Sequence, residues 1–165
     1  MEFILRKWEV DDLDSLVEYA NNYKIAKNLM NVFPHPYTAE DGIRFIETNS
    51  RQEPVQVFAI TINNKACGAI GIFPQYDIMC KNAELGYWLA EPYWGNGIIT
   101  KAIEQMVEYA FNTWNINRVY ARPFGSNIAS QKALEKAGFK LEAKMEKTIF
   151  KFGEYEDEYI YAIRK

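Results

Sequence analysis

The sequence predicts a single α/β domain, and three observations carry this prediction. The 165 residues suffice for one substantial hydrophobic core and are too few for two ordinary domains. Short β-rich runs alternate with segments of helical periodicity, in the order β α α β β β α β α β β. No internal repeat, linker or low-complexity stretch divides the chain, so we expect one domain over residues 1–165.

The N-terminal part predicts one strand followed by helices. A β-rich run covers 3–8, and Asp11 or Asp12 can cap the next helix, whose apolar residues fall on one side. A second short helical piece is expected over 23–30, before a Pro-rich segment that disfavours helix. Thr38 caps a third helix that runs to about residue 49.

A β-hairpin is the strongest signal in the middle of the chain. Two β-rich runs, 55–62 and 66–73, flank a tight turn at Asn63 and Asn64, residues that tolerate the left-handed backbone of short hairpin loops. A further strand is expected over 83–91.

The segment after Gly97 predicts a long helix with one buried face. Its apolar residues recur at helical spacing, at Ile99, Ala102, Ile103, Met106, Val107 and Ala110. The remaining expected elements are a strand over 117–123, a helix over 127–139 that closes at Gly138, and two last strands over 140–150 and 157–164.

Charge and composition exclude several classes of function. A formal net charge of −3 and a pI near 5.3 argue against a nucleic-acid footprint, which needs clustered Lys and Arg. No run approaches the roughly 18 apolar residues of a membrane span, and the first residues do not form a basic and then apolar leader. We therefore expect a cytoplasmic protein with no membrane or nucleic-acid partner.

The sequence offers no ligand set for a metal. Cys67 and Cys80 lack CxxC spacing, and the chain has a single histidine, His35, between two prolines. Zinc sites and Cys-His dyads need more such residues at close spacing. We expect reduced thiols, no metal and no catalytic role for His35.

Gly95 and Gly97 stand at the threshold of the long helix. The first N–H groups of a helix lack intrahelical partners and favour an anion, and glycine lets a phosphate approach the backbone closely. An isolated G-x-G also fits a plain sharp turn between strand and helix. Thr100 replaces the third glycine of a dinucleotide fingerprint, and no P-loop motif occurs.

Two longer segments carry a family resemblance. ELGYWLAEPYWGNGIITKAIEQMVEYAF, over 84–111, is followed by NRVYARPFGSNIASQKALEKAGF, over 117–139. In this order they resemble the GNAT superfamily of acyl-CoA-dependent N-acetyltransferases, and within it the RimJ/RimL-type branch. The resemblance extends over nearly the whole chain. It implies a central, mixed but mostly antiparallel twisted sheet of about seven strands, flanked by helices.

The resemblance also implies how acetyl-CoA would bind. The family loop has the form [Arg/Gln]-x-x-Gly-x-[Gly/Ala], and here Trp94 stands first, Gly97 fourth and the bulkier Ile99 last. The backbone of 95–100 would hold the pyrophosphate, a backbone N–H of 88–90 would face the thioester oxygen, and the N-x-x-S pair Asn127 and Ser130 would contact the pantetheine arm or thioester. The implied cofactor-binding residues are Trp88, Leu89, Ala90, Trp94, Gly95, Asn96, Gly97, Ile98, Ile99, Thr100, Asn127 and Ser130.

Acetyl transfer to an amine needs a neutral amine, stabilisation of the developing oxyanion and preferably a proton for the departing thiolate. Glu84, at the start of the central strand, is the first candidate base. Asp157 or Glu158 could instead bind the substrate ammonium group, and an ordered water chain is a third possibility. Many family members use a tyrosine as acid where this chain has Leu134, so Ser130 becomes the candidate donor to the sulfur.

These expectations combine into acetyl-CoA-dependent N-acetyltransfer by direct attack in a ternary complex. The acceptor would be a primary amine, on a small molecule or a protein N-terminus, and the protein a monomer or homodimer. The alternative is a non-catalytic acyl-CoA-binding regulatory module, which Leu134 leaves open. A structural or nucleic-acid-associated domain is disfavoured by the acidic charge balance.

Overall fold

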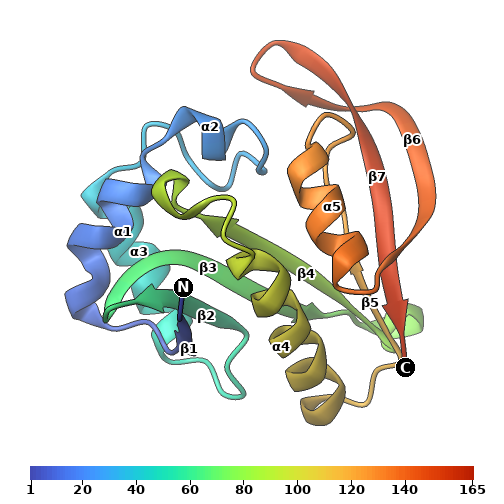
Figure 1. The fold of residues 1–165 in the computed structure, drawn as a ribbon, viewed down its shortest axis with the longest axis horizontal. Coiled ribbons are helices and arrows are strands. Elements are labelled where there is room, and N and C mark those ends of the chain that lie inside the picture. Colours follow the sequence, from blue (N-terminus) through green and yellow to red (C-terminus); the bar gives the residue numbers. More distant parts are fainter. The chain divides into compact units, whose positions relative to one another are not determined.

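The computed structural model describes residues 1–165 and contains seven strands and five α-helices (Figure 1). The strands are β1 (Ile4–Arg6), β2 (Val57–Ile62), β3 (Lys65–Pro74), β4 (Asn82–Leu89), β5 (Arg118–Ala121), β6 (Lys140–Lys151) and β7 (Glu154–Arg164). The helices are α1 (Leu13–Ala20), α2 (Tyr23–Ala26), α3 (Ala39–Ser50), α4 (Ile98–Thr113) and α5 (Ile128–Lys136), with short 3-10 turns η1 (Val10–Asp12), η2 (Asp77–Met79) and η3 (Glu91–Tyr93).

One sheet contains all seven strands, in the order β1-β2-β3-β4-β5-β7-β6. The pairs β1–β2, β2–β3, β5–β7 and β6–β7 are antiparallel, and β4–β5 is parallel. The mostly antiparallel seven-stranded sheet is thus confirmed. The predicted element order differs from the structure at one place, because three helices and not two lie between β1 and β2. None of the helices is long and apolar enough to cross a membrane.

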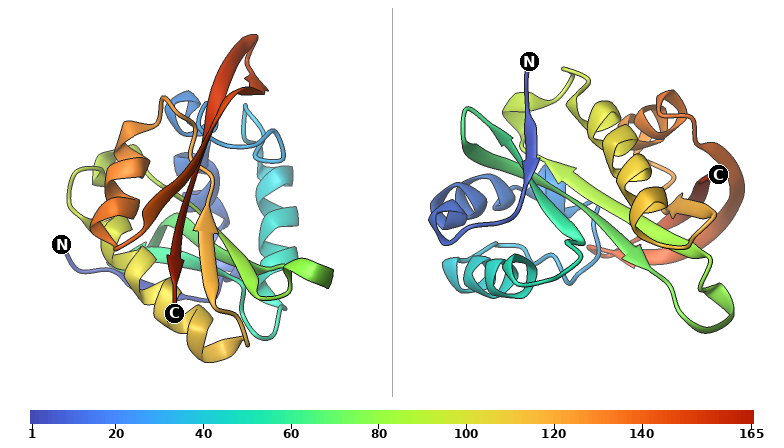
Figure 2. Two further views of the ribbon diagram at one scale, coloured as in Figure 1. Left: turned by 90° about the vertical axis from the view of Figure 1, so that its right-hand side faces the viewer. Right: turned by 90° about the horizontal axis from the view of Figure 1, so that it is seen from below.

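The chain forms two compact units, and strands β3 and β4 run through both. Unit 1 comprises Met1–Gly71 and Tyr87–Ile98, and unit 2 comprises Ile72–Gly86 and Ile99–Lys165. Unit 1 has a continuous apolar core that includes Trp8, Leu16, Ile46 and Trp88. In it, α1 and α3 lie side by side (Figures 1 and 2).

Unit 2 contains the C-terminal strands and most of α4. Figure 2 shows β6 and β7 as a long hairpin, whose turn uses positive φ at Phe152 and Gly153. The predicted buried face of α4 is confirmed at Ala102, Ile103, Met106, Val107 and Ala110, which are buried. At the start of the helix the prediction is one residue off, because Ile98 is buried and the predicted Ile99 is only half-buried. Helix α5 ends as predicted: Gly138 has φ +94° and Phe139 N donates to Leu134 O.

Local chemistry fixes several element boundaries. Asn63 and Asn64 both have positive φ, and Ile62 pairs with Lys65 across them, which is the two-residue hairpin turn that the sequence predicts. Strand β4 ends at Leu89 and not at 91, because the 3-10 turn η3 begins at Glu91 and contains Pro92, which cannot donate to a ladder. Helix α2 ends at Ala26, earlier than the expected residue 30.

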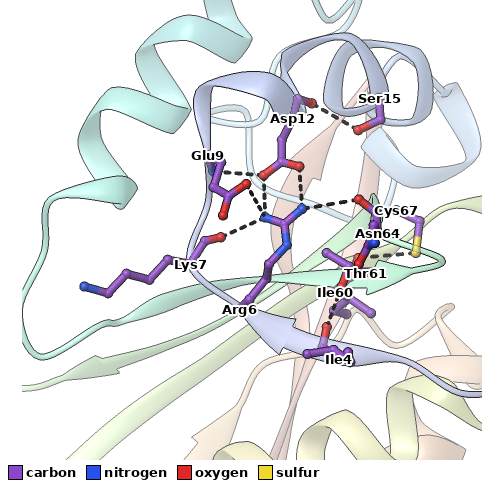
Figure 3. Close-up of polar contacts among 10 residues, drawn as sticks. All are labelled: Ile4, Arg6, Lys7, Glu9, Asp12, Ser15, Ile60, Thr61, Asn64 and Cys67. Carbon is purple, nitrogen blue, oxygen red and sulfur yellow. Dashed lines mark hydrogen bonds and ion pairs between the residues drawn. The ribbon is translucent and has the colours of Figure 1, made fainter.

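Asp12 occupies the N-cap position of α1, as one of the two predicted alternatives, but the expected capping bond of its side chain is not made. Its carboxylate instead accepts the Glu9 N–H at 2.9 Å and both Arg6 Nη atoms, at 2.8 and 2.7 Å (Figure 3). Because a guanidinium fork matches a carboxylate better than a single amide does, Asp12 ties β1 to η1.

Gly68 allows a close approach between β3 and β4 within unit 1. A Cβ atom at this position would lie 2.5 Å from Trp88 O and 3.2 Å from Leu89 Cα. Both are backbone atoms, so they cannot rotate away. No pattern in the sequence indicates this contact.

We expect Gly68→Ala to lower the free energy of unfolding by about 1–3 kcal/mol, the usual range for overpacking. The measurement is the urea midpoint at constant m value. Gly86→Ala is the matched control, because a Cβ at Gly86 would meet only Phe73 Cε2, at an ordinary 3.7 Å. An equal change in both variants would contradict the close-approach explanation.

Candidate active site

The segment before α4 contains both glycines of the predicted phosphate loop. Gly95 has φ +78° and Gly97 φ +72°, values that side chains with a Cβ adopt only with strain. A Cβ built at either position would meet no atom within 4 Å. The turn geometry therefore requires glycine here, and the space beside both residues is open for a ligand to approach the backbone.

Side chains anchor this loop within unit 1. Trp94 Nε1 donates to Leu89 O at 2.7 Å, which fastens the loop to the end of β4. Asn96 Nδ2 donates to the carbonyl oxygens of Tyr93 and Trp94, both at 3.1 Å. These bonds give Trp94 and Asn96 a structural role, and they leave the main chain of the glycines as the surface offered to a ligand.

The end of β4 presents the backbone amides predicted to face a thioester. Trp88, Leu89 and Ala90 are all buried. Ala90 N donates to Cys67 O at 2.7 Å, so its N–H is already used by β3. Because successive N–H groups of a strand point to opposite sides, the Leu89 N–H is directed away from β3.

Glu84 lies at the last residue pair of the parallel β4–β5 ladder. The register runs from Asn82↔Arg118 to Glu84↔Tyr120. Strand β5 ends one residue later, whereas β4 continues to Leu89. Glu84 therefore stands where the two strands cease to pair.

The surroundings of Glu84 favour its protonated form. Burial raises the pKa of this carboxyl above its ordinary 4.5, and the charge of Glu158 raises it further. The charge of Arg122 and a hydrogen bond with Tyr120 lower the pKa in part. A carboxyl whose pKa lies above its ordinary value is better suited to accept a proton near neutral pH.

Glu158, one of the two carboxylates considered for the substrate ammonium group, is paired with an arginine of the protein. It is 6% exposed, and Arg122 Nε and Nη2 donate to its two carboxylate oxygens at 3.1 and 3.0 Å. Asp157 Oδ1 accepts the Lys147 N–H at 2.9 Å. The structure thus gives both carboxylates partners that the sequence did not indicate.

The N-terminus of α5 brings together the predicted Asn127 and Ser130. Asn127 is the N-cap, and its side-chain oxygen accepts the Ser130 N–H at 3.3 Å. Leu134, which stands where the family resemblance implies a tyrosine in many members, is fully buried. Asn127 therefore has a capping function whether or not a ligand is bound.

The first turn of α4 contains the other predicted cofactor residues. Ile98 is 2% exposed, so only its backbone could contact a ligand, while Ile99 and Thr100 are half-buried.

Arg122 and Tyr120 were not predicted as neighbours of Glu84. The one available signal was the Arg-Pro pair that ends the predicted strand 117–123.

Comparison with known proteins identifies the family of the chain. The family model described as "Acetyltransferase (GNAT) domain" matches residues 2–140. The uncharacterized N-acetyltransferase p20 of Bacillus licheniformis is 29% identical over 165 residues, covering 98% of this chain and 92% of p20.

Solved structures share the fold. A GNAT-family acetyltransferase from Bacillus anthracis superposes with a TM-score of 0.85 at 25% identity, covering 99% of this chain and 95% of that one. RimL, a ribosomal L7/L12 α-N-protein acetyltransferase in complex with coenzyme A, has a TM-score of 0.83 at 23% identity, covering 98% and 93%. The chain belongs to the GNAT family and is an N-acetyltransferase.

Proposed function

We propose that residues 1–165 act as one acetyltransferase domain that moves an acetyl group from acetyl-CoA to a primary amine, with Glu84 as the general base. The observation that carries the proposal is the half-buried carboxyl of Glu84 at the end of the β4–β5 ladder, with its raised pKa. In this role Glu84 accepts a proton from the attacking amine, directly or through one water molecule.

The residues of unit 1 fit the binding of coenzyme A. When bound, acetyl-CoA supplies an activated acetyl thioester. The open backbone at Gly95 and Gly97, followed by the first turn of α4, would hold the pyrophosphate. The Leu89 N–H, directed away from β3, would donate to the thioester oxygen. In unit 2, we assign the pantetheine contacts to Asn127 and Ser130.

The serine contributes less to catalysis than the glutamate in this proposal. A serine hydroxyl is a weak acid, so Ser130 would donate a hydrogen bond to the sulfur without carrying the step. Since Leu134 is buried and carries no proton that it could donate, no tyrosine-like acid acts at that position. We expect Ser130→Ala to reduce turnover far less than loss of Glu84.

For the acceptor we propose a protein N-terminus or a small primary amine. RimL is an α-N-protein acetyltransferase of ribosomal L7/L12, and this supports including N-terminal peptides. A non-catalytic acyl-CoA-binding module is the second candidate, and the buried Leu134 is the observation that favours it. Amine-dependent thiol release from acetyl-CoA separates the two.

Ligand-dependent melting tests the coenzyme assignment. A ligand that binds only the native state at about 100 times its Kd stabilises it by roughly 2.7 kcal/mol. We expect coenzyme A and acetyl-CoA to raise the melting temperature, and NADH and ATP at equal concentration to raise it less or not at all. Stabilisation by NADH or ATP alone would contradict the coenzyme A loop, and Gly95 and Gly97 would then only form a turn between strand and helix.

We expect Gly97→Ala to weaken acetyl-CoA binding by about tenfold, equivalent to one lost hydrogen bond. The new Cβ strains a backbone at φ +72° and enters the open space beside the loop amides. Calorimetric titration measures the affinity. Gly153→Ala is the matched control, because Gly153 has φ +81° and equally open surroundings; it should lose similar stability and keep the affinity.

A further inference from the structure

We propose that Arg122 and Glu158 are positioning residues that keep Glu84 available as a proton acceptor by holding the guanidinium away from it. The inference rests on the proposed function, in which Glu84 is the base. Neither Arg122 nor Glu158 needs to touch a substrate in this role.

The geometry shows that Arg122 binds the carboxylate of Glu158 and not that of Glu84. Its Nε and Nη2 atoms make two nearly equal hydrogen bonds to the oxygens of Glu158, at 3.1 and 3.0 Å. The remaining nitrogen, Nη1, lies 3.9 Å from Glu84 Oε1, which is too far for a hydrogen bond. The bidentate pair fixes the plane of the guanidinium, so Glu84 receives its charge but no bond.

Backbone contacts fix Arg122 beside Glu158. Arg122 follows the last residue of β5, and the next residues run along β7. Gly125 N donates to Asp157 O at 2.8 Å, Tyr159 N donates to Pro123 O at 2.9 Å, and Phe124 bridges to Glu158. The arginine backbone therefore cannot move far, and rotation of its side chain decides which carboxylate it binds.

Burial makes the pair with Glu158 the stable choice. The Glu158 side chain is 8% exposed, compared with 29% for Glu84. A deeply buried carboxylate loses more when its partner leaves than a half-exposed one does. Glu84 is thus the carboxylate that the fold leaves without a bidentate partner.

Changes at Glu158 and Arg122 should act on Glu84 in opposite directions. Arg122, Glu158 and Tyr120 are the titratable groups that act on Glu84. Without the Glu158 charge, a raising influence disappears and Arg122 is free to close on Glu84, so both effects lower the pKa of Glu84. Without Arg122, a lowering influence disappears and the pKa of Glu84 rises. The hydrogen bond with Tyr120 is common to all variants.

The direct test is a carbon-13 NMR titration of the Glu84 carboxyl carbon in the whole 165-residue chain, assigned with Glu84→Gln. We expect the midpoint to move to lower pH in Glu158→Gln and to higher pH in Arg122→Gln. Glu154→Gln, an exposed change of the same charge on β7, should leave it in place. A midpoint that stays unmoved in both variants, or moves in the opposite directions, overturns the inference.

A double variant guards against failure of Arg122→Gln to fold with an unpaired buried Glu158. Arg122→Gln/Glu158→Gln removes both charges together, which is tolerated better than removal of one. Since the lowering influence of Arg122 is then absent, its Glu84 midpoint should lie above that of Glu158→Gln. A midpoint at or below that of Glu158→Gln would contradict the role of Arg122.

The dependence of kcat/KM on pH separates this inference from the assignment of the base. If Glu84 is the base, the acid limb should follow the NMR midpoint in each variant, and the plateau of Glu158→Gln should fall by about 3- to 10-fold because a weaker base transfers protons less effectively. If the midpoints move as expected and the acid limbs do not, the positioning role stands and the base assignment fails.

Discussion

Replacement of Glu84 by glutamine should lower kcat/KM for amine acetylation by about 10²- to 10⁴-fold, the usual contribution of general acid-base catalysis. Glutamine keeps the size of the side chain and cannot accept the proton. Because Glu84 is not among the residues that we propose to bind the cofactor, we expect the Kd for acetyl-CoA to stay within about twofold. Steady-state kinetics and calorimetry measure the two quantities.

The same substitution should stabilise the folded protein at neutral pH. The pKa of Glu84 is raised in the fold, so this group contributes most to stability below its unfolded pKa and loses that contribution as the pH rises through the folded pKa. At neutral pH the half-buried charge therefore destabilises the native state, and glutamine removes it. Glu84→Gln should melt higher than the wild type at pH 7.5, and the difference should shrink as the pH falls toward about 4.

The loss of activity and the gain in melting temperature of Glu84→Gln together show whether the carboxylate acts in catalysis or only in folding. A loss of activity with a gain in stability is the expected trade-off at a functional site. Unchanged kcat in Glu84→Gln would assign the proton transfer to water or to another group. Glu154→Gln, which removes an exposed charge, should change neither the rate nor the melting temperature.

Asp12→Ala should produce the largest loss of stability, about 3 kcal/mol. The Asp12 side chain is 5% exposed and accepts the Arg6 fork and the Glu9 N–H (Figure 3). Its removal leaves a guanidinium that is only 25% exposed without a carboxylate. Breaking a buried pair typically costs about 3–5 kcal/mol, and the partial exposure of Arg6 places this one at the lower end. Urea denaturation measures the change.

Two variants serve as controls for Asp12→Ala: one changes the neighbouring residue Asp11, and the other removes both partners of the ion pair. Asp11→Ala removes an exposed carboxylate and should change the free energy of unfolding by no more than about 0.5 kcal/mol. Arg6→Met/Asp12→Ala removes both charges and should recover part of the loss. Equal destabilisation by Asp11→Ala and Asp12→Ala would contradict the role of the pair.

Local signals predicted most of the fold. The periodicity of α4, the Asn63–Asn64 turn and the glycine that ends α5 depend on residues close together in the chain, and the structure confirms them. Element ends were less accurate where two local preferences compete. Strand β4 is shorter than predicted because Pro92 lies in the 3-10 turn that follows it. The Asp12 carboxylate, which was expected to cap α1, instead accepts a hydrogen bond from Arg6.

For the candidate site, the sequence indicated residue types but none of the contacts between them. Gly95 and Gly97 could be identified because a left-handed backbone favours glycine, and glycine is visible in the sequence. The pair that surrounds Glu84 could not, since Arg122 and Glu158 are 36 residues apart and only the β5–β7 pairing brings them together. Gly68 was missed for the same reason, because nothing in its own strand shows how near Trp88 O lies.

The most direct test of catalysis is acetyl-CoA-dependent, amine-dependent thiol release by the wild type, with Glu84→Gln in parallel. The panel should include N-terminal peptides, polyamines, amino acids and amino sugars, with mass spectrometry of the product. We expect at least one amine to gain an acetyl group as thiol is released, and the glutamine variant to lose this activity while it still binds acetyl-CoA. Binding of acetyl-CoA without thiol release for any amine would contradict the catalytic account and identify an acyl-CoA-binding module.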